Sequence, residues 1–203
     1  MRTGILLGLL LFGACGRGGC PGGDRVERLR SQFNGGCCEF STAGGACRAN
    51  EGWVRNEGRE CVRWAAECLG QLGPAAASAV PDLVQAVGTG PNNYDTGDGV
   101  IPVRDSIVIA LGQAGGEQAL PVLLEALANP RPVEAGPGAV GFASAEPVGE
   151  EAALTALRHL GGAAKPALPA IRKLLERPQR TAMDERVVRA AQAAIRAIES
   201  SAY

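Results

Sequence analysis

Histidine, methionine and aromatic residues are scarce in this chain. Its 203 residues include one His, two Met, four Phe, two Trp and two Tyr. With His159 alone, the sequence offers neither a Ser-His-Asp arrangement nor paired His-Glu motifs, and it lacks the glycine loop with lysine that binds nucleotide phosphates. His159 falls near the end of a predicted helix, where the helix dipole favours a cation. We therefore expect no enzyme active site, no cofactor and no small-molecule substrate.

An overall excess of positive charge is also missing. Lys and Arg number 20 against 21 Asp and Glu, which gives a net charge of -1 and a pI of about 5.9. The chain as a whole therefore has no positive field that would attract nucleic acid. We expect a protein partner and no nucleic-acid partner.

The start of the chain lacks a hydrophobic run long enough to cross a membrane as a helix. Arg2 precedes an uncharged run from Gly4 to Phe12, and small residues follow it. This is the three-part layout of a signal peptide. We predict a signal peptide at residues 1–14 and export of the remaining chain.

The end of this segment, Phe12-Gly13-Ala14-Cys15, resembles the bacterial lipobox, although Phe12 stands where leucine is usual. The resemblance implies that Cys15 is acylated and anchors the protein to a membrane. It also implies the outer membrane, because Gly16 is not the acidic residue typical of inner-membrane retention. The alternative is ordinary secretion to the periplasm or beyond, with Cys15 as a further thiol.

Residues 15–58 form a Cys/Gly-rich segment in which only Asp24 to Phe33 is predicted to be helical. Two further cysteines follow this segment, which gives six cysteines besides Cys15. An even number favours disulfide bonds in an oxidising compartment, and the candidates are Cys20, Cys37, Cys38, Cys47, Cys61 and Cys68. The last two lie on one predicted helix, about 10.5 Å apart along its axis, which is too far for a bond between them. Cys68 also fits as a small buried hydrophobic residue. The cysteine spacing is not that of a zinc knuckle, so we predict no metal site.

A helical pattern repeats through residues 59–203. Residues 61–73, 103–115 and 149–161 align with one another, and each is followed by a similar five-residue signature with proline in the middle. Such a proline marks the first turn of a second helix. In the central copy the apolar residues fall on one face of each helix: Val103, Ile107, Ala110, Leu111 and Ala114 on the first, and Leu120, Leu123, Leu124 and Leu127 on the second.

The repeats start at residues 61, 103, 149 and 187, a spacing typical of two-helix repeats. The first helices resemble those of HEAT repeats of the short, PBS-lyase-type kind, and the match is best at Val103-Arg104. The resemblance implies an all-α fold, a short α-solenoid of about three helical hairpins. Val187 to Ile198 supplies a C-terminal capping helix, and the loop-rich Cys/Gly segment precedes the repeats. Stacking is required because one hairpin cannot bury its own apolar stripe.

A solenoid of this kind is expected to be a scaffold that binds another protein, here in the bacterial cell envelope. The alternatives are a structural envelope tether without a binding groove and a HEAT-like enzyme such as a lyase relative. Candidate partner-binding residues are non-core positions of the second helices that differ between repeats, and we expect them on the concave surface: Asp82, Gln85, Val122, Glu125, Arg172 and Lys173.

Two long loops, residues 88–102 and 128–148, each join a second helix to the next first helix. A solenoid places such loops on the same edge, and long loops are often functional. The stretch Asn92 to Gly99 is rich in side-chain oxygens but lacks the EF-hand spacing. We expect a polar turn there, with a calcium site as the alternative.

Charge is divided unevenly along the repeats. Residues 62–157 contain three Arg against eleven Asp or Glu, whereas residues 158–200 contain nine Lys or Arg against four acidic residues. Arg186, Arg189 and Arg196 share one face of the last helix, outside its apolar stripe. This basic face is either a solubilising cap or a surface for an anionic partner or membrane headgroups.

Overall fold

The computed structural model describes residues 26–35, 56–95, 100–131, 133–135, 149–178 and 182–201. The predicted signal peptide lies outside these residues. So do five of the seven cysteines, for which acylation or disulfide bonding stays a prediction: Cys15, Cys20, Cys37, Cys38 and Cys47.

Helices dominate the described chain. They are α1 (Val26–Gly35), α2 (Asn56–Leu72), α3 (Val80–Thr89), α4 (Val103–Ala114), α5 (Leu120–Ala128), α6 (Glu150–Leu160), α7 (Leu168–Leu175) and α8 (Ala182–Ser200). Short 3-10 segments, Gly73–Ala79, Gly116–Ala119 and Gly161–Ala167, lead into α3, α5 and α7. A small sheet has the order β2-β1-β3 and is formed by β1 (Tyr94–Asp95), β2 (Val100–Ile101) and β3 (Glu134–Ala135).

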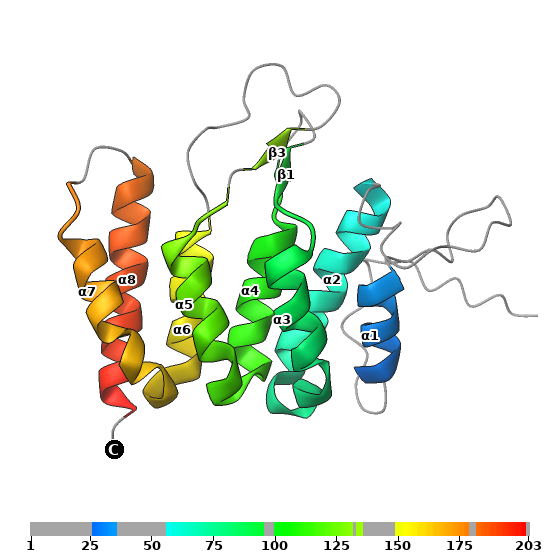
Figure 1. The fold of residues 1–203 in the computed structure, drawn as a ribbon, viewed down its shortest axis with the longest axis horizontal. Helices are drawn as coiled ribbons and strands as arrows, with labels where there is room; N and C mark the ends of the chain where they lie inside the picture. Colours follow the sequence, from blue (N-terminus) through cyan, green and yellow to red (C-terminus); the bar gives the residue numbers. More distant parts are fainter. Residues whose placement is uncertain are drawn as a thin grey trace, which may run out of the picture.

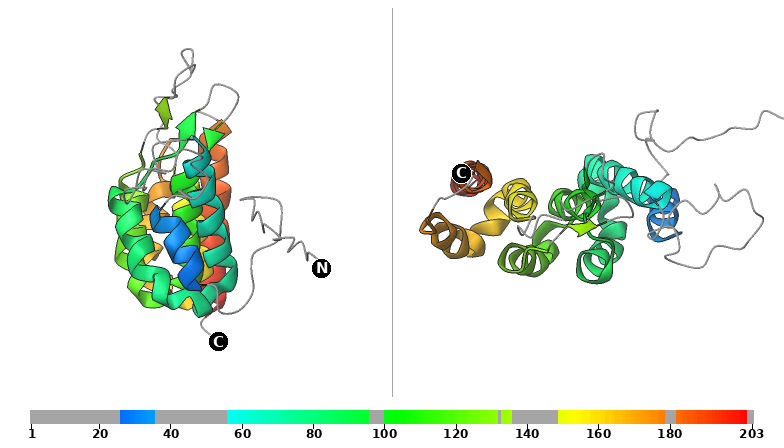
Figure 2. Two further views of the ribbon diagram at one scale, coloured as in Figure 1. Left: turned by 90° about the vertical axis from the view of Figure 1, so that its right-hand side faces the viewer. Right: turned by 90° about the horizontal axis from the view of Figure 1, so that it is seen from above.

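The repeat helices stand side by side in two rows (Figures 1 and 2). One row holds the first helices, α2, α4, α6 and α8, and the other holds the second helices, α3, α5 and α7. Each first helix packs against the next first helix, and each second helix packs against the first helix that follows it. The predicted all-α solenoid of three hairpins and a capping helix is confirmed.

One glycine in each hairpin turn reverses the chain. Its backbone is left-handed, with φ between +51° and +56°, a conformation that glycine adopts without steric cost: Gly73, Gly116 and Gly161. The proline of each signature then stands in the first turn of the second helix, where its missing N–H breaks no hydrogen bond: Pro81, Pro121 and Pro169. The turn chemistry therefore fixes where each hairpin bends.

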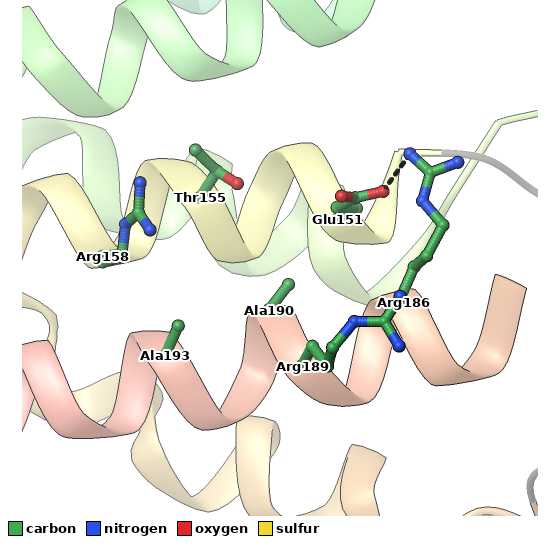
Figure 3. A pocket seen from close by; sticks show the side chains of 7 residues that line it. All are labelled: Glu151, Thr155, Arg158, Arg186, Arg189, Ala190 and Ala193. Atoms are coloured by element: carbon green, nitrogen blue, oxygen red, sulfur yellow. Dashed lines mark ion pairs between the residues drawn. The ribbon is translucent and has the colours of Figure 1, made fainter.

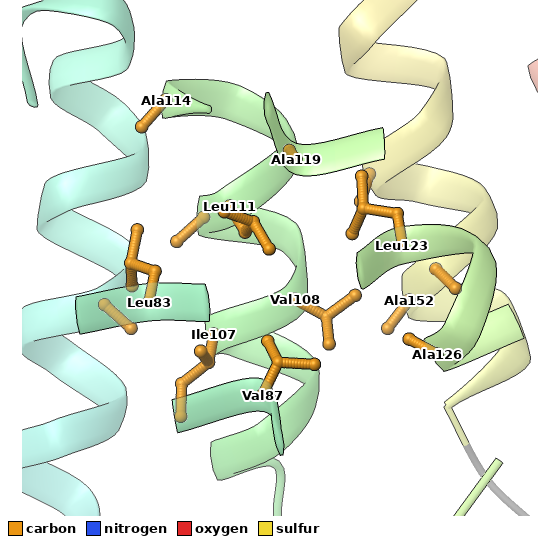
Figure 4. Close-up of a cluster of buried hydrophobic side chains, with 14 of the residues drawn as sticks. Leu83, Val87, Ile107, Val108, Leu111, Ala114, Ala119, Leu123, Ala126 and Ala152 are labelled. Atoms are coloured by element: carbon orange, nitrogen blue, oxygen red, sulfur yellow. The ribbon is translucent and has the colours of Figure 1, made fainter. Parts of the chain in front are cut away.

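A continuous hydrophobic core runs from Leu29 in α1 to Ile198 in α8. Figure 4 shows its central part, where side chains of α3 and α5 approach α4 from two sides. The predicted stripe of α4 is at most 5% exposed: Val103, Ile107, Ala110, Leu111 and Ala114. In α8, four of the five residues expected inside are buried, namely Val187, Ala191, Ala194 and Ile198, which confirms its capping role.

Helix α1 belongs to the same core. Leu29 and Phe33 are fully buried, and α1 packs against α2. The Nε atom of Arg30 donates a hydrogen bond of 2.6 Å to a carboxylate oxygen of Asp82 in α3. Although residues 26–35 fall within the Cys/Gly-rich segment, they extend the solenoid by one helix.

Gly70 and Gly112 stand at the same position of two first helices and let neighbouring helices approach closely. A Cβ atom added at Gly112 would lie 2.5 Å from the Cα atom of Ala156 in α6, and one added at Gly70 would lie 3.0 Å from the Cα atom of Ala110 in α4. Carbon atoms in contact normally stay about 3.5–4.0 Å apart. The backbones of successive first helices are therefore in contact at these two glycines.

The substitution Gly112→Ala should lower the free energy of unfolding by about 2 kcal/mol, because the added methyl group overpacks a backbone contact. Gly88→Ala in α3 is the matched control, since its Cβ would meet no atom within 4 Å. It should raise stability by up to about 1 kcal/mol through helix propensity. Urea unfolding followed by circular dichroism measures both, and equal stability of the two variants would contradict the close contact.

Candidate functional site

An open groove of about 350 Å³ lies between the first helices α6 and α8. Figure 3 shows the side chains that line it. They come from both helices and include three arginines: Glu151, Thr155, Arg158, Arg186, Arg189, Ala190 and Ala193.

Helical spacing places these residues on the solvent side of each helix. In α6, Glu151, Thr155 and Arg158 follow one another at intervals of four and three residues, so they share one face. The neighbouring side of α6, with Leu154 and Leu157, is buried in the core. The lining residues of α8 repeat the same periodicity and face α6 across the groove. The packing of the two apolar stripes therefore fixes the separation of the groove walls.

The charges of the groove are only partly neutralised. Arg186 forms an ion pair of 2.7 Å with Glu151. Arg189 lies 3.7 Å from Glu185, and both side chains are about two-thirds exposed, so this pair contributes little energy. Among the described residues Arg158 takes part in no ion pair. With three arginines and one glutamate in its lining, the groove is positively charged.

Arg158 is the site residue that the sequence argument overlooked. In the alignment of 61–73, 103–115 and 149–161, it occupies the position of Gly70 and Gly112. At those glycines even a Cβ atom would collide with the next first helix, whereas Arg158 is exposed beside α8. The replacement of glycine by arginine is visible in the aligned repeats, and it places a charged side chain in the lining of the groove.

A second depression of about 360 Å³ lies at the hairpin turns. His159 lines it, and its Nε2 atom is 3.5 Å from Nε2 of Gln113. Burial and the neighbouring charge of Arg158 lower the pKa of His159, which favours the neutral form of its imidazole ring. Its lining contains no carboxylate, serine or cysteine that would pair with His159 for catalysis.

The six candidate residues of the second helices do not line either of these depressions. Three are engaged within the fold: Asp82 is bonded to Arg30, Val122 packs against the core, and Arg172 pairs with Glu199 at 2.8 Å. Glu125 accepts a hydrogen bond of 2.6 Å from Asn129. The exposed Gln85 and Lys173 complete the set.

The two long loops meet at one edge of the solenoid, as expected. β1 pairs with β2 in antiparallel fashion and with β3 in parallel. Glu134 in β3 accepts hydrogen bonds from both terminal nitrogens of Arg59, at 3.2 and 3.1 Å, and from Asn92 at 2.9 Å. The guanidinium group of Arg59 also lies 4.0 Å from the ring centre of Tyr94. This network fastens the loops to α2.

The polar stretch Asn92 to Gly99 is described only as far as Asp95. The side-chain oxygen of Asn93 accepts a hydrogen bond of 3.1 Å from the backbone N–H of Asp105. Within the described ranges, no three His, Cys, Asp or Glu side chains are grouped so as to hold a metal ion. In the same ranges, no helix has the length and apolar composition needed to cross a membrane.

Arg104 and Asp105 at the start of α4 are charged groups taken out of water. Arg104 is only 4% exposed, and among the described residues its Nε and Nη1 atoms have no hydrogen-bond partner. Burial lowers the pKa of Arg104 and so does the charge of Arg131, while Asp105 opposes them. Burial raises the pKa of Asp105. Both groups therefore cost folding energy at neutral pH.

A family model described as PBS lyase HEAT-like repeat matches residues 103–129, which comprise α4, the following turn and α5. The match supports a HEAT-like repeat protein, and repeats of this kind generally mediate protein–protein interactions. No curated protein and no solved structure gives a significant match.

The double variant Arg104→Met/Asp105→Asn should be more stable than the unmodified protein, because two buried, poorly partnered charges are removed. Its free energy of unfolding should be higher by about 1 kcal/mol or more. In the unmodified protein, the raised pKa means that the native state favours protonated Asp105. The stability that protonated Asp105 contributes is present below about pH 4, and it is lost as the pH rises through the raised pKa. The gain from the variant should therefore be larger at neutral pH than below about pH 4.

Arg59→Met is the control for this variant, because it removes an arginine that does have partners, Glu134 and Tyr94. It should lower stability by about 1 kcal/mol. Urea unfolding of the three proteins over a range of pH compares them. A loss of stability in the double variant at neutral pH would show that Arg104 and Asp105 stabilise the fold.

Proposed function

We propose that this chain is an exported, lipid-anchored scaffold that binds another protein of the cell envelope. The observation that carries the binding role is the groove between α6 and α8, which is an open and charged recess on a solenoid with a continuous core. Rigid stacked repeats present extended surfaces to a partner with little loss of conformational freedom. The carboxylate that lines this groove, Glu151, is ion-paired with Arg186, and we assign a binding role and no catalytic step.

The cellular address in this proposal rests on the first residues of the chain. Residues 1–14 have the layout of a signal peptide, and Cys15 stands at the acylated position of the lipobox. A single acyl chain gives only weak membrane binding, and stable anchoring needs a second one. Bacterial lipoprotein processing, which acylates the cysteine more than once, would meet this requirement.

Disulfide bonds that hold the Cys/Gly-rich segment against α2 belong to the same proposal. Cys61 and Cys68 support them, because both lie on the buried side of α2 in an exported chain with an even number of further cysteines. Their separation along one helix prevents a bond between them. We propose that each is joined to a cysteine of the segment 15–58, which would fit an oxidising compartment such as the periplasm.

The substitution Cys15→Ser should remove acylation and shift the protein from the membrane fraction to the soluble fraction of the producing bacterium. Cys20→Ser is the matched control and should leave the protein in the membrane fraction. Fractionation with immunoblotting, together with the mass of the purified chains, reports both effects. If Cys15→Ser stays with the membrane as the control does, the lipid anchor is excluded.

Binding to an envelope protein is tested by cross-linking in intact cells, followed by purification of the tagged chain and mass spectrometry. A discrete adduct with one envelope protein is the expected result. If only the uncross-linked chain is recovered from cells that hold it in the membrane, the scaffold proposal fails.

A further inference from the structure

We propose that the groove between α6 and α8 binds an acidic segment of the partner protein, with Arg158 and Arg189 pairing with its carboxylates. This inference rests on the proposed scaffold function and names the chemistry of the partner. The groove, its charge and its position in the repeat series support it independently.

The first support is the supply of uncommitted positive charge. Arg186 is engaged by Glu151 at 2.7 Å, but Arg158 has no ion pair among the described residues and Arg189 only the long, exposed contact with Glu185. Arginine binds carboxylates with two parallel hydrogen bonds, which makes it well suited to acidic side chains. Two arginines on facing helices would hold two carboxylates of one bound segment.

The second support is the shape of the groove. Its floor on the α8 side is formed by Ala190 and Ala193, whose small side chains leave room for a bound backbone. Thr155 on α6 adds a hydroxyl group between the charged ends. A volume of about 350 Å³ is suited to a few residues of a peptide and is smaller than a protein domain.

An anionic membrane surface fits this groove less well. Helices that lie on membranes combine basic residues with large apolar side chains that enter the lipid. Among the described residues, Val100 is the exposed large hydrophobic side chain, and it belongs to β2 and not to α8. The arginines also line a recess, whereas lipid headgroups present a flat surface. We therefore assign the groove to a protein segment.

The third support comes from the repeat series. The two earlier first helices carry Gly70 and Gly112 at the position of Arg158, and their contacts with the next helix are closed. Arg158 in α6 instead carries a long, charged and exposed side chain at this position, beside α8.

The test uses the purified full chain and a short fluorescent peptide of alternating glutamate and serine, with a glutamine-serine peptide of the same length as a comparison. Fluorescence anisotropy should show binding of the glutamate peptide alone, and this binding should weaken as salt is added. Arg158→Gln and Arg189→Gln should each reduce affinity about tenfold. Circular dichroism should show that both variants are folded.

The double variant Arg158→Gln/Arg189→Gln, the groove variant, should bind the peptide more weakly than either single variant. The matched control is Arg172→Gln/Lys173→Gln on α7, which removes the same charge from an exposed face outside the groove. It should bind the peptide nearly as well as the unmodified chain. If the peptide does not bind, or if the control weakens binding as much as the groove variant does, the inference is overturned.

Two further outcomes would also overturn it. One is binding of phosphatidylglycerol vesicles, but not of the peptide, in a manner that depends on Arg158 and Arg189. The other is self-association that the groove variant abolishes, seen by sedimentation, which would make the occupant a second copy of this chain. Cross-linking in cells separates the scaffold proposal from the groove proposal. If the Arg158→Gln/Arg189→Gln variant still forms the envelope adduct, the scaffold proposal stands, but the groove is not the surface that binds the partner.

Discussion

The close contact between successive first helices is the constraint on which the rest of the structure depends. Gly70 and Gly112 bring the backbones of α2, α4 and α6 together, and the buried alanines of these helices keep the seam narrow. Each small residue buries little apolar area, but together they allow many close dispersion contacts between successive first helices. The second helices then cover the other side of the core, and no hairpin has to be stable alone.

This constraint also explains why one place in the series differs. A side chain at the glycine position is incompatible with the closed seam, so Arg158 can stand only where the next helix leaves space. That space is the groove beside α8. Its arginines belong to the C-terminal part of the repeats, where basic residues outnumber acidic ones. Architecture and site are therefore linked through a single repeat position.

The sequence predicted the hairpins, the buried stripes and the meeting of the two long loops, because helical periodicity and turn residues are local properties. It did not predict which exposed positions are free. Asp82 is engaged by Arg30 of α1, which lies far from it in the chain, and Val122 is covered by neighbouring helices. Arg104 was recognised as part of the Val-Arg pair of the repeat pattern, but its burial results from packing between repeats and was not predicted. The aligned repeats did contain the arginine of the groove, but its significance depends on the helix that faces it.

The account's central claim is that a partner protein occupies the groove and not the face of the second helices. Placing a photo-reactive amino acid at Thr155 in the groove, or at the exposed Gln85 on α3, tests it directly in intact cells. The account predicts that irradiation gives an adduct with an envelope protein from position 155 and none from position 85. An adduct from position 85 alone would contradict it and would place the partner on the second helices.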